Sequence, residues 1–158
     1  MELQGSREGS GRRFAIVASS FNKEFAEGLL RGARGALSEC GVSDADVTVV
    51  RVPGAYEIPL AASHLATTGR FHGVICLGCL IKGDTMHFEY IAEAVSQGIM
   101  TVGADTGVPV TFGVLTTLTE EQAAVRSADG PDNKGREAAL AAVEMATIVE
   151  AIGRLGRA

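Results

Sequence analysis

Short apolar runs alternate with segments of helical periodicity along most of the chain. The runs lack a strict alternation of apolar and polar residues, which is typical of strands buried on both faces of a parallel sheet. The strand candidates are FAIVAS at 14–19, VTVVRV at 47–52, GVICLG at 73–78, IMTVGA at 99–104 and VTFGVLT at 110–116. Helical spacing predicts helices over 25–41, 55–69, 87–98 and 136–156, and a short one that ends at Arg126. Strands separated by helices predict an α/β fold: a flavodoxin-like three-layer α/β/α sandwich with a central parallel sheet.

Composition and charge limit the classes of function. The 158 residues suit one domain, which we place at 14–158, after a polar segment, MELQGSREGSGRR at 1–13, that we interpret as a flexible N-terminal arm. A net charge of −5 argues against binding to nucleic acid or to an anionic membrane. No apolar run approaches the roughly 20 residues of a membrane span, and the start resembles no signal peptide. With three cysteines, an odd number, we expect a reducing, cytoplasmic location.

Informative side chains follow the predicted strands. In doubly wound sheets, ligands bind beyond the carboxyl ends of the strands. Phe21 and Asn22 follow the first strand, and Ala55, Tyr56 and Glu57 follow the second. An aromatic ring such as Phe21 can stack on a flat ligand or belong to the core, and Glu57 can accept hydrogen bonds from a polyol or be an ordinary exposed residue.

The turn after the third strand carries two further candidates. Lys82 to Thr85 reads KGDT between a strand and a helix start, where free N–H groups, a glycine and a threonine hydroxyl can bind phosphate. Alternatively, Asp84 or Thr85 only caps the helix. His87 titrates near neutral pH and would stand one turn above this phosphate cradle, although a lone histidine is usually structural.

Two basic residues near the end of the chain are also candidates. Arg126 can give the bidentate contact that a phosphate favours, and Lys134 precedes the last predicted helix. Both can equally be solvated surface charges.

Cys76 and Cys79 form a CxxC pair, a spacing that occurs in metal and redox sites. Residues three apart on a strand point to opposite faces, so a shared metal or a disulfide is disfavoured. The chain has no second CxxC to complete a zinc site. We interpret both cysteines as small buried apolar residues.

Five collinear segments resemble one enzyme family. They are SSFN, VPGAYEIPLAA, GCLIKGDTMHFEYIAEAVSQGI, TGVPVTFGVLTTLTEEQAAVR and NKGREAA, spread over about 14–150. The spacing of GxxIKGxTxHF and PVxFGxLTxxTxEQAxxR is highly specific. In this respect the chain is similar to the lumazine synthases of riboflavin biosynthesis. The resemblance implies condensation of 5-amino-6-(ribitylamino)uracil with 3,4-dihydroxy-2-butanone 4-phosphate, loss of phosphate and water, and no metal or cofactor.

The resemblance also implies roles for individual residues. His87 matches the proton-transfer residue, and the other matching positions bind substrate: Phe21 at the pyrimidine; Ala55, Tyr56 and Glu57 at the ribityl chain; Cys79, Leu80 and Ile81 at the ring edge; Phe112 closing the pocket; Asp84, Thr85 and Arg126 at the phosphate; Lys134 and Glu137 in support. Asn22, next to Phe21, is a further substrate-binding position. Two positions depart from the usual pattern. Asp84 brings a negative charge to the phosphate turn, so its side chain is a doubtful ligand, and Phe21 replaces a tryptophan while keeping the stacking surface.

By the same resemblance the chain forms a homo-oligomer. Sites would lie between neighbours in a ring of five, one subunit giving Phe21, Glu57 and His87 and the next giving Phe112 and Arg126. Some members of the family stop at the pentamer and others form a shell of sixty subunits, and both assemblies stay open here. The 126–134 loop has no insertion of the kind that pentamer-only members tend to have, which favours the shell, but its SADGPD lacks the glycine-lysine-alanine-glycine pattern usual in shells. Riboflavin synthase is a further expected partner. A flavodoxin-like FMN-binding electron carrier lacks support because no Ser/Thr-rich loop follows the first strand, and a lumazine-binding protein without catalysis is disfavoured by intact His87 and Arg126.

Overall fold

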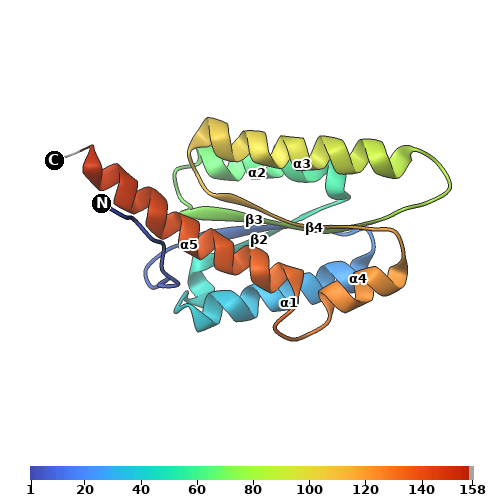
Figure 1. Ribbon diagram of the computed structural model, residues 1–158, viewed down its shortest axis with the longest axis horizontal. Helices are drawn as coiled ribbons and strands as arrows, with labels where there is room; N and C mark the ends of the chain where they lie inside the picture. Colours follow the sequence, from blue (N-terminus) through green and yellow to red (C-terminus); the bar gives the residue numbers. More distant parts are fainter. Residues whose placement is uncertain (157–158) are drawn as a thin grey trace.

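The computed structural model describes residues 1–156, and they form three layers (Figure 1). The middle layer is a parallel sheet of order β2-β1-β3-β4, built from β1 (Phe14–Ser19), β2 (Val47–Val52), β3 (Gly73–Ile81) and β4 (Val110–Thr117). The outer layers are α2 (Ile58–Thr67) with α3 (His87–Thr106) on one face, and α1 (Lys23–Glu39), α4 (Glu120–Ser127) and α5 (Lys134–Leu155) on the other. Short 3₁₀ turns, Asp44–Asp46 and Ala55–Glu57, precede β2 and α2. The predicted three-layer α/β fold is confirmed.

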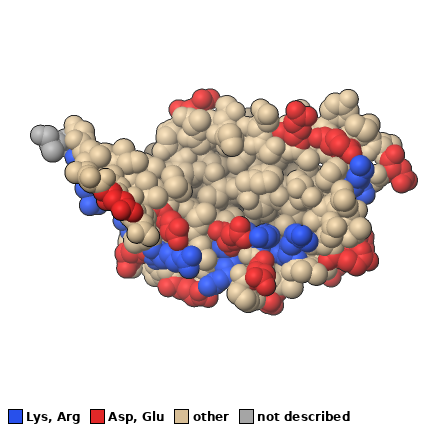
Figure 2. Space-filling view, in the orientation of Figure 1, with Lys and Arg blue, Asp and Glu red and all other residues tan. Residues whose placement is uncertain are grey.

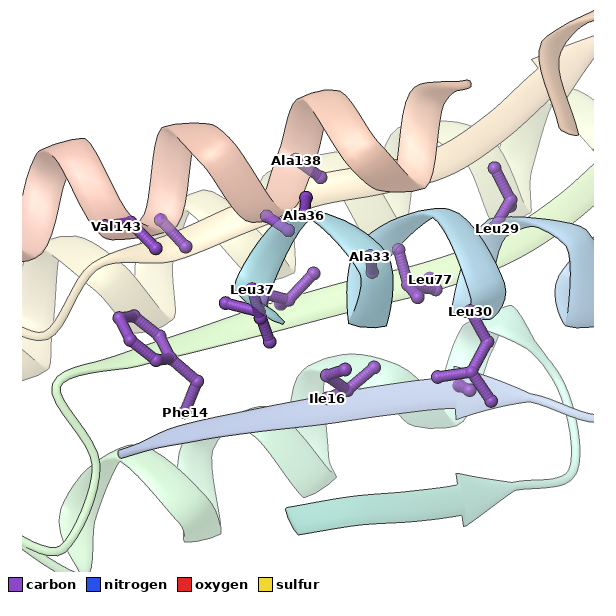
Figure 3. Close-up of a cluster of buried hydrophobic side chains, with 14 of the residues drawn as sticks. Phe14, Ile16, Leu29, Leu30, Ala33, Ala36, Leu37, Leu77, Ala138 and Val143 are labelled. Carbon is purple, nitrogen blue, oxygen red and sulfur yellow. The ribbon is translucent and has the colours of Figure 1, made fainter. Parts of the chain in front are cut away.

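Each face of the sheet has its own apolar core. Phe14 and Ile16 of β1 point to the α1 and α5 side, where they pack with Leu37 and Val143 (Figure 3). The alternate residues of β1 pack in the second cluster with α2 and α3. Because both faces are covered, the strands need apolar residues at successive positions, which accounts for the unbroken runs in the sequence.

One predicted strand is wrong. Residues 99–104 belong to α3 and not to the sheet, which therefore has four strands. Val95, Ile99 and Val102 are buried at spacings of four and three, so the apolar residues of this stretch form one face of a helix. A short apolar run fits a strand and a helix equally, and the long helix before it decides between them. No described helix, including α3, is long and apolar enough to cross a membrane.

The predicted end of this helix at Gly98 is also wrong. A Cβ at Gly98 would lie 2.9 Å from a ring carbon of Pro59, so this glycine lets α3 approach α2 closely. The helix ends instead before Gly107, whose left-handed backbone (φ 70°) is the conformation that glycine adopts without strain. A glycine inside a helical pattern therefore marks a helix contact here and not a terminus.

The N-terminal segment 1–13 has no helix or strand and lies against α5. Arg12 pairs with Glu150 of α5 at 2.8 Å, and the Ser6 N–H donates to the Thr147 hydroxyl at 2.9 Å. The hydrogen bond from Arg12 lowers the pKa of the Glu150 carboxyl. These contacts show where the segment lies, while its flexibility stays a prediction.

Cys76 and Cys79 lie on β3 and point to opposite faces, as predicted. Cys76 belongs to the core beneath α2 and α3, and Cys79 belongs to the core beneath α1 and α5. Both thiols are free, and burial raises the pKa of Cys76 to about 12 and that of Cys79 to about 11. They are small core residues that stay protonated at neutral pH.

Candidate active site

A cleft of about 500 Å³ lies at the carboxyl ends of the strands. The chain goes from β1 to β2 on one side and returns to β3 on the other, so β1 and β3 flank the point where the strand order reverses. We call this the carboxyl-end cleft. Its walls are the segments after β1 and β2, the last residues of β3 with the turn that follows, and the start of α3. The lining residues are Phe21, Asn22, Gly54, Ala55, Tyr56, Glu57, Cys79, Leu80, Ile81, Gly83, Thr85, His87, Phe88 and Ile91.

Asn22 fixes the segment after β1. Its backbone is left-handed (φ 51°, ψ 50°), a conformation that asparagine tolerates better than most residues. Its side-chain amide donates to the carbonyl oxygen of Cys79 at 2.9 Å, which ties this turn to the end of β3. Phe21, just before it, donates its N–H to the Pro53 carbonyl at 3.1 Å and keeps its side chain 69% exposed. An aromatic ring on a fixed backbone is thus open for stacking.

The segment after β2 presents a second aromatic ring and a carboxylate. The Oε2 of Glu57 accepts a hydrogen bond from the Gly54 N–H at 2.9 Å, which closes the turn before α2. Tyr56 lies inside this turn and is 62% exposed. The turn therefore places a carboxylate and a hydroxyl-bearing ring in fixed positions beside the cleft.

His87 begins α3 and lines the cleft from the side of the third strand. The turn before it is held at both ends: Lys82 donates its N–H to the Thr117 carbonyl at 2.9 Å, and its ammonium pairs with Glu89 at 2.7 Å. The ion pair lowers the pKa of the Glu89 carboxyl. The imidazole is exposed, so a bound molecule in the cleft can reach it.

The predicted phosphate turn lies at the mouth of the same cleft. Gly83 and Thr85 line it, and a Cβ at Gly83 would meet nothing within 4 Å. The Thr85 hydroxyl accepts a long hydrogen bond, 3.4 Å, from the His87 N–H. Asp84 is exposed and does not line the cleft, and it does not cap α3, whose N-cap is Met86 without a side-chain cap. The His87 N–H is thus already engaged, while the Phe88 N–H of the same first turn remains open to an anion.

A second cleft, of about 380 Å³, lies between β4 and the start of α5. We call it the edge-strand cleft, because β4 is an edge of the sheet. Phe112 lines it from β4, and the exposed Arg126 lines it from the last turn of α4. Lys134 and Glu137 form an ion pair of 2.6 Å on the first turn of α5. One Nη of Arg126 donates to the Gln122 carbonyl at 3.0 Å, which orients the guanidinium along α4.

The structure divides the predicted site residues into two groups. The two clefts share no lining residue among those described. Ten predicted residues line the carboxyl-end cleft, namely Phe21, Asn22, Ala55, Tyr56, Glu57, Cys79, Leu80, Ile81, Thr85 and His87, and four line the edge-strand cleft, namely Phe112, Arg126, Lys134 and Glu137. Phe88 and Ile91 also line the carboxyl-end cleft and were not among the predicted residues. Ile91 lies four residues after His87 in α3, so the two side chains share one face of the helix. This spacing could have predicted Ile91 from the sequence.

Comparisons with known proteins show the family of the chain. The model of the family described as 6,7-dimethyl-8-ribityllumazine synthase matches residues 11–150. A relative of that name from Desulfotalea psychrophila is 48% identical over 150 residues, 95% of this chain and 97% of its own. "6,7-dimethyl-8-ribityllumazine synthase 1" of Caulobacter vibrioides is 55% identical over 129 residues, 82% of this chain and 84% of its own. A match over nearly the whole length shows that the chain belongs to the 6,7-dimethyl-8-ribityllumazine synthase family.

Proposed function

We propose that this protein is a transferase of riboflavin biosynthesis that condenses 5-amino-6-(D-ribitylamino)uracil with 3,4-dihydroxy-2-butanone 4-phosphate. The products are 6,7-dimethyl-8-ribityllumazine, phosphate and water. One observation carries the proposal: in a chain of this family, the carboxyl-end cleft brings Phe21, Glu57 and His87 together. The alternative of a flavin- or lumazine-binding protein without catalysis is not favoured by the family match.

Each wall of the carboxyl-end cleft has a task in this reaction. Phe21 stacks on the pyrimidine ring, and the fixed turn of Tyr56 and Glu57 binds the hydroxyl groups of the ribityl chain. The reaction joins the 5-amino group to the ketone, eliminates phosphate and closes the second ring with loss of water. Such chemistry depends on orienting two reactants, and His87 transfers the protons.

The edge-strand cleft supplies the phosphate-binding cations. Arg126 keeps donors free beyond the one bonded to Gln122 and has the planar fork that matches a phosphate. Lys134 adds a point charge that is partly balanced by Glu137. Positive groups that bind the phosphate also stabilise it as it leaves.

The two clefts become one site when two copies of the chain meet. Because Phe112 and Arg126 line a cleft separate from that of His87, one chain supplies the ring side and its neighbour supplies the phosphate side. Repetition of this head-to-tail contact closes a ring, for which the family resemblance implies five subunits. A sixty-subunit shell and association with riboflavin synthase stay predictions.

The surface of the chain supports such a contact. Figure 2 shows a broad uncharged area above a row of basic and acidic side chains that follows α5. A groove between α3, β4 and α5 is lined by apolar residues, including Met100, Phe112, Met145 and Val149, and the first three are more than 40% exposed. A groove lined by several exposed apolar side chains is typical of a protein–protein interface.

A turnover assay with both substrates tests the proposed function. Formation of the lumazine is followed by its absorbance and fluorescence, with the uncatalysed condensation subtracted. We expect saturable turnover that depends on both substrates, and Arg126→Ala should raise the KM of the butanone phosphate without raising that of the uracil. Tight binding of the lumazine or of a flavin without turnover would instead support a binding protein.

A further inference from the structure

Asn133 is a buried polar residue to which the sequence analysis gave no role. It is 1% exposed and lies between α4 and α5. Its side-chain nitrogen lies within 3.1 Å of the carbonyl oxygens of Gly28, Ser127 and Ala128, and its side-chain oxygen accepts from the Arg136 N–H at 3.0 Å. The two hydrogens of the amide are shared among three acceptors, so every polar atom of the side chain is engaged.

Three of these four partners, all except Gly28, lie at the ends of two helices. Ser127 and Ala128 end α4, where the last carbonyl groups lack partners within the helix, and the Arg136 N–H belongs to the first turn of α5. One carboxamide thus caps the carboxyl end of α4 and the amino end of α5 and joins both to α1 through Gly28. A single buried residue sets how the two helix ends face each other.

The two basic groups of the edge-strand cleft stand directly beside this link. Arg126 precedes the bonded Ser127 by one residue, and Lys134 follows Asn133. Both lie in the same cleft, although they come from different helices. Any shift of Asn133 therefore moves one cation relative to the other.

The contact surface of α1 is shaped to fit Asn133. A Cβ at Gly32 would overlap the carboxamide of Asn133, and one at Gly28 would overlap the Ser127 carbonyl. Gly35, one turn along the same helix, would meet nothing within 4 Å and is exposed. The absence of side chains at the first two positions is what makes room for the link.

We propose that Asn133 is a positioning residue for the phosphate side of the active site, holding the ends of α4 and α5 so that Arg126 and Lys134 face the same cleft. The inference rests on the proposed function, because it takes the edge-strand cleft as the phosphate site. Displacement of a binding group by about 1 Å can cost up to about 100-fold in rate, so a small shift of these helix ends has a large effect. None of the described residues that line the carboxyl-end cleft belongs to α4 or α5, so we expect that cleft to be unaffected.

Two variants of α1 form a matched test. Gly32→Ala displaces Asn133 without removing any hydrogen-bonding group, whereas Gly35→Ala makes the same chemical change where there is open space. Asn133→Asp is a second probe, because it keeps the acceptor for Arg136 and loses the donors to the three carbonyl groups. Melting temperature, kcat and the KM of each substrate are measured for all three, together with inhibition by inorganic phosphate.

We expect Gly32→Ala and Asn133→Asp to raise the KM of the butanone phosphate about tenfold, as for a weakened charge-assisted contact. The inhibition constant of inorganic phosphate should rise in parallel. The KM of the uracil should stay within about twofold, and Gly35→Ala should match the unmodified protein in both KM values. If Asn133 had only a structural role, the variants would have a lower melting temperature, but the KM of the butanone phosphate would not rise more than that of the uracil.

Arg126→Ala, measured in parallel, separates the two levels of failure. If Arg126→Ala raises the KM of the butanone phosphate while Gly32→Ala leaves both KM values unchanged, the proposed role of Asn133 is wrong. The assignment of the edge-strand cleft as the phosphate site then still holds. If Arg126→Ala itself has no effect on that KM, the phosphate site is wrong and the inference falls with it. Since Asn133→Asp places a carboxylate among carbonyl oxygens and can prevent folding, Gly32→Ala decides the outcome.

Discussion

Mixing two impaired variants tests whether the active site is shared between chains. His87→Ala removes the proton-transfer group from the carboxyl-end cleft, and Arg126→Ala removes the cation from the edge-strand cleft. Both side chains are exposed, and Arg126 bonds only to a carbonyl of its own helix among the described residues, so both variants should fold and assemble normally. Each assembly made of one variant lacks the same group in every site.

The expected activity of a mixed assembly follows from the arrangement of the clefts. If each site joins the first cleft of one chain to the second cleft of its neighbour, it is intact only when an Arg126→Ala chain precedes a His87→Ala chain. With equal amounts and random placement in a head-to-tail ring, this occurs at about one quarter of the sites. If both clefts of one chain served one site, every site would lack one group and the mixture would gain nothing.

The two variants are coexpressed or refolded together. Turnover is measured at a butanone phosphate concentration far below the KM of the Arg126→Ala variant, so that sites lacking Arg126 contribute little activity. Unmodified chains mixed with the double variant provide the control. They should retain about one quarter of full activity with a shared site and about one half with a site inside one chain. Mixed variants no more active than the separate ones, with the control near one half, would refute the shared site.

Three further predictions concern single groups. His87→Ala should leave the melting temperature unchanged and lower kcat by about 10²-fold, because uncatalysed condensation limits the loss; an unchanged kcat at saturation would remove His87 from the mechanism. Asp84→Asn should lower the KM of the butanone phosphate about twofold at low salt and have no effect at high salt, since the exposed carboxylate repels phosphate. The thiols of Cys76 and Cys79 should resist a thiol reagent at pH 8 until the protein unfolds. Burial raises the folded-state pKa of Cys76 from 9 to about 12 and that of Cys79 to about 11. Their contribution to the free energy of unfolding is therefore full below pH 9 and is lost as the pH rises from 9 through about 11 for Cys79 and about 12 for Cys76, which denaturant titration can measure.

The sequence predicted the layers of the fold because the strands are buried on both faces. Unbroken apolar runs such as 14–19 and 73–78, once helices separate them, are typical of a parallel sheet that is covered on both sides. The run 99–104 failed because a helix face and a short strand look alike over six residues. What decides is the buried spacing of Val95, Ile99 and Val102, which depends on where α3 packs on α2 and so on tertiary structure.

The candidate site was predictable where chemistry follows a strand and not where it depends on packing. Phe21, Glu57 and His87 each lie just after a strand, so topology alone brings them together. Asn133 gave no such signal, since an asparagine before a helix predicts only a cap. Its additional bonds to the end of α4 and to Gly28 of α1 arise from how three helices meet, which no local pattern records.

The division of the site into two clefts has a physical consequence for how the proposed reaction depends on assembly. An exposed aromatic ring at Phe21 and an exposed guanidinium at Arg126 are both in contact with water in the single chain. Charge-assisted contacts strengthen only when water leaves. In the proposed arrangement, the contact that buries the apolar surface near Phe112 also closes the site over both substrates. On this proposal, it is the free energy of the contact between chains that excludes water from the site and orders His87 and Arg126 around the substrates.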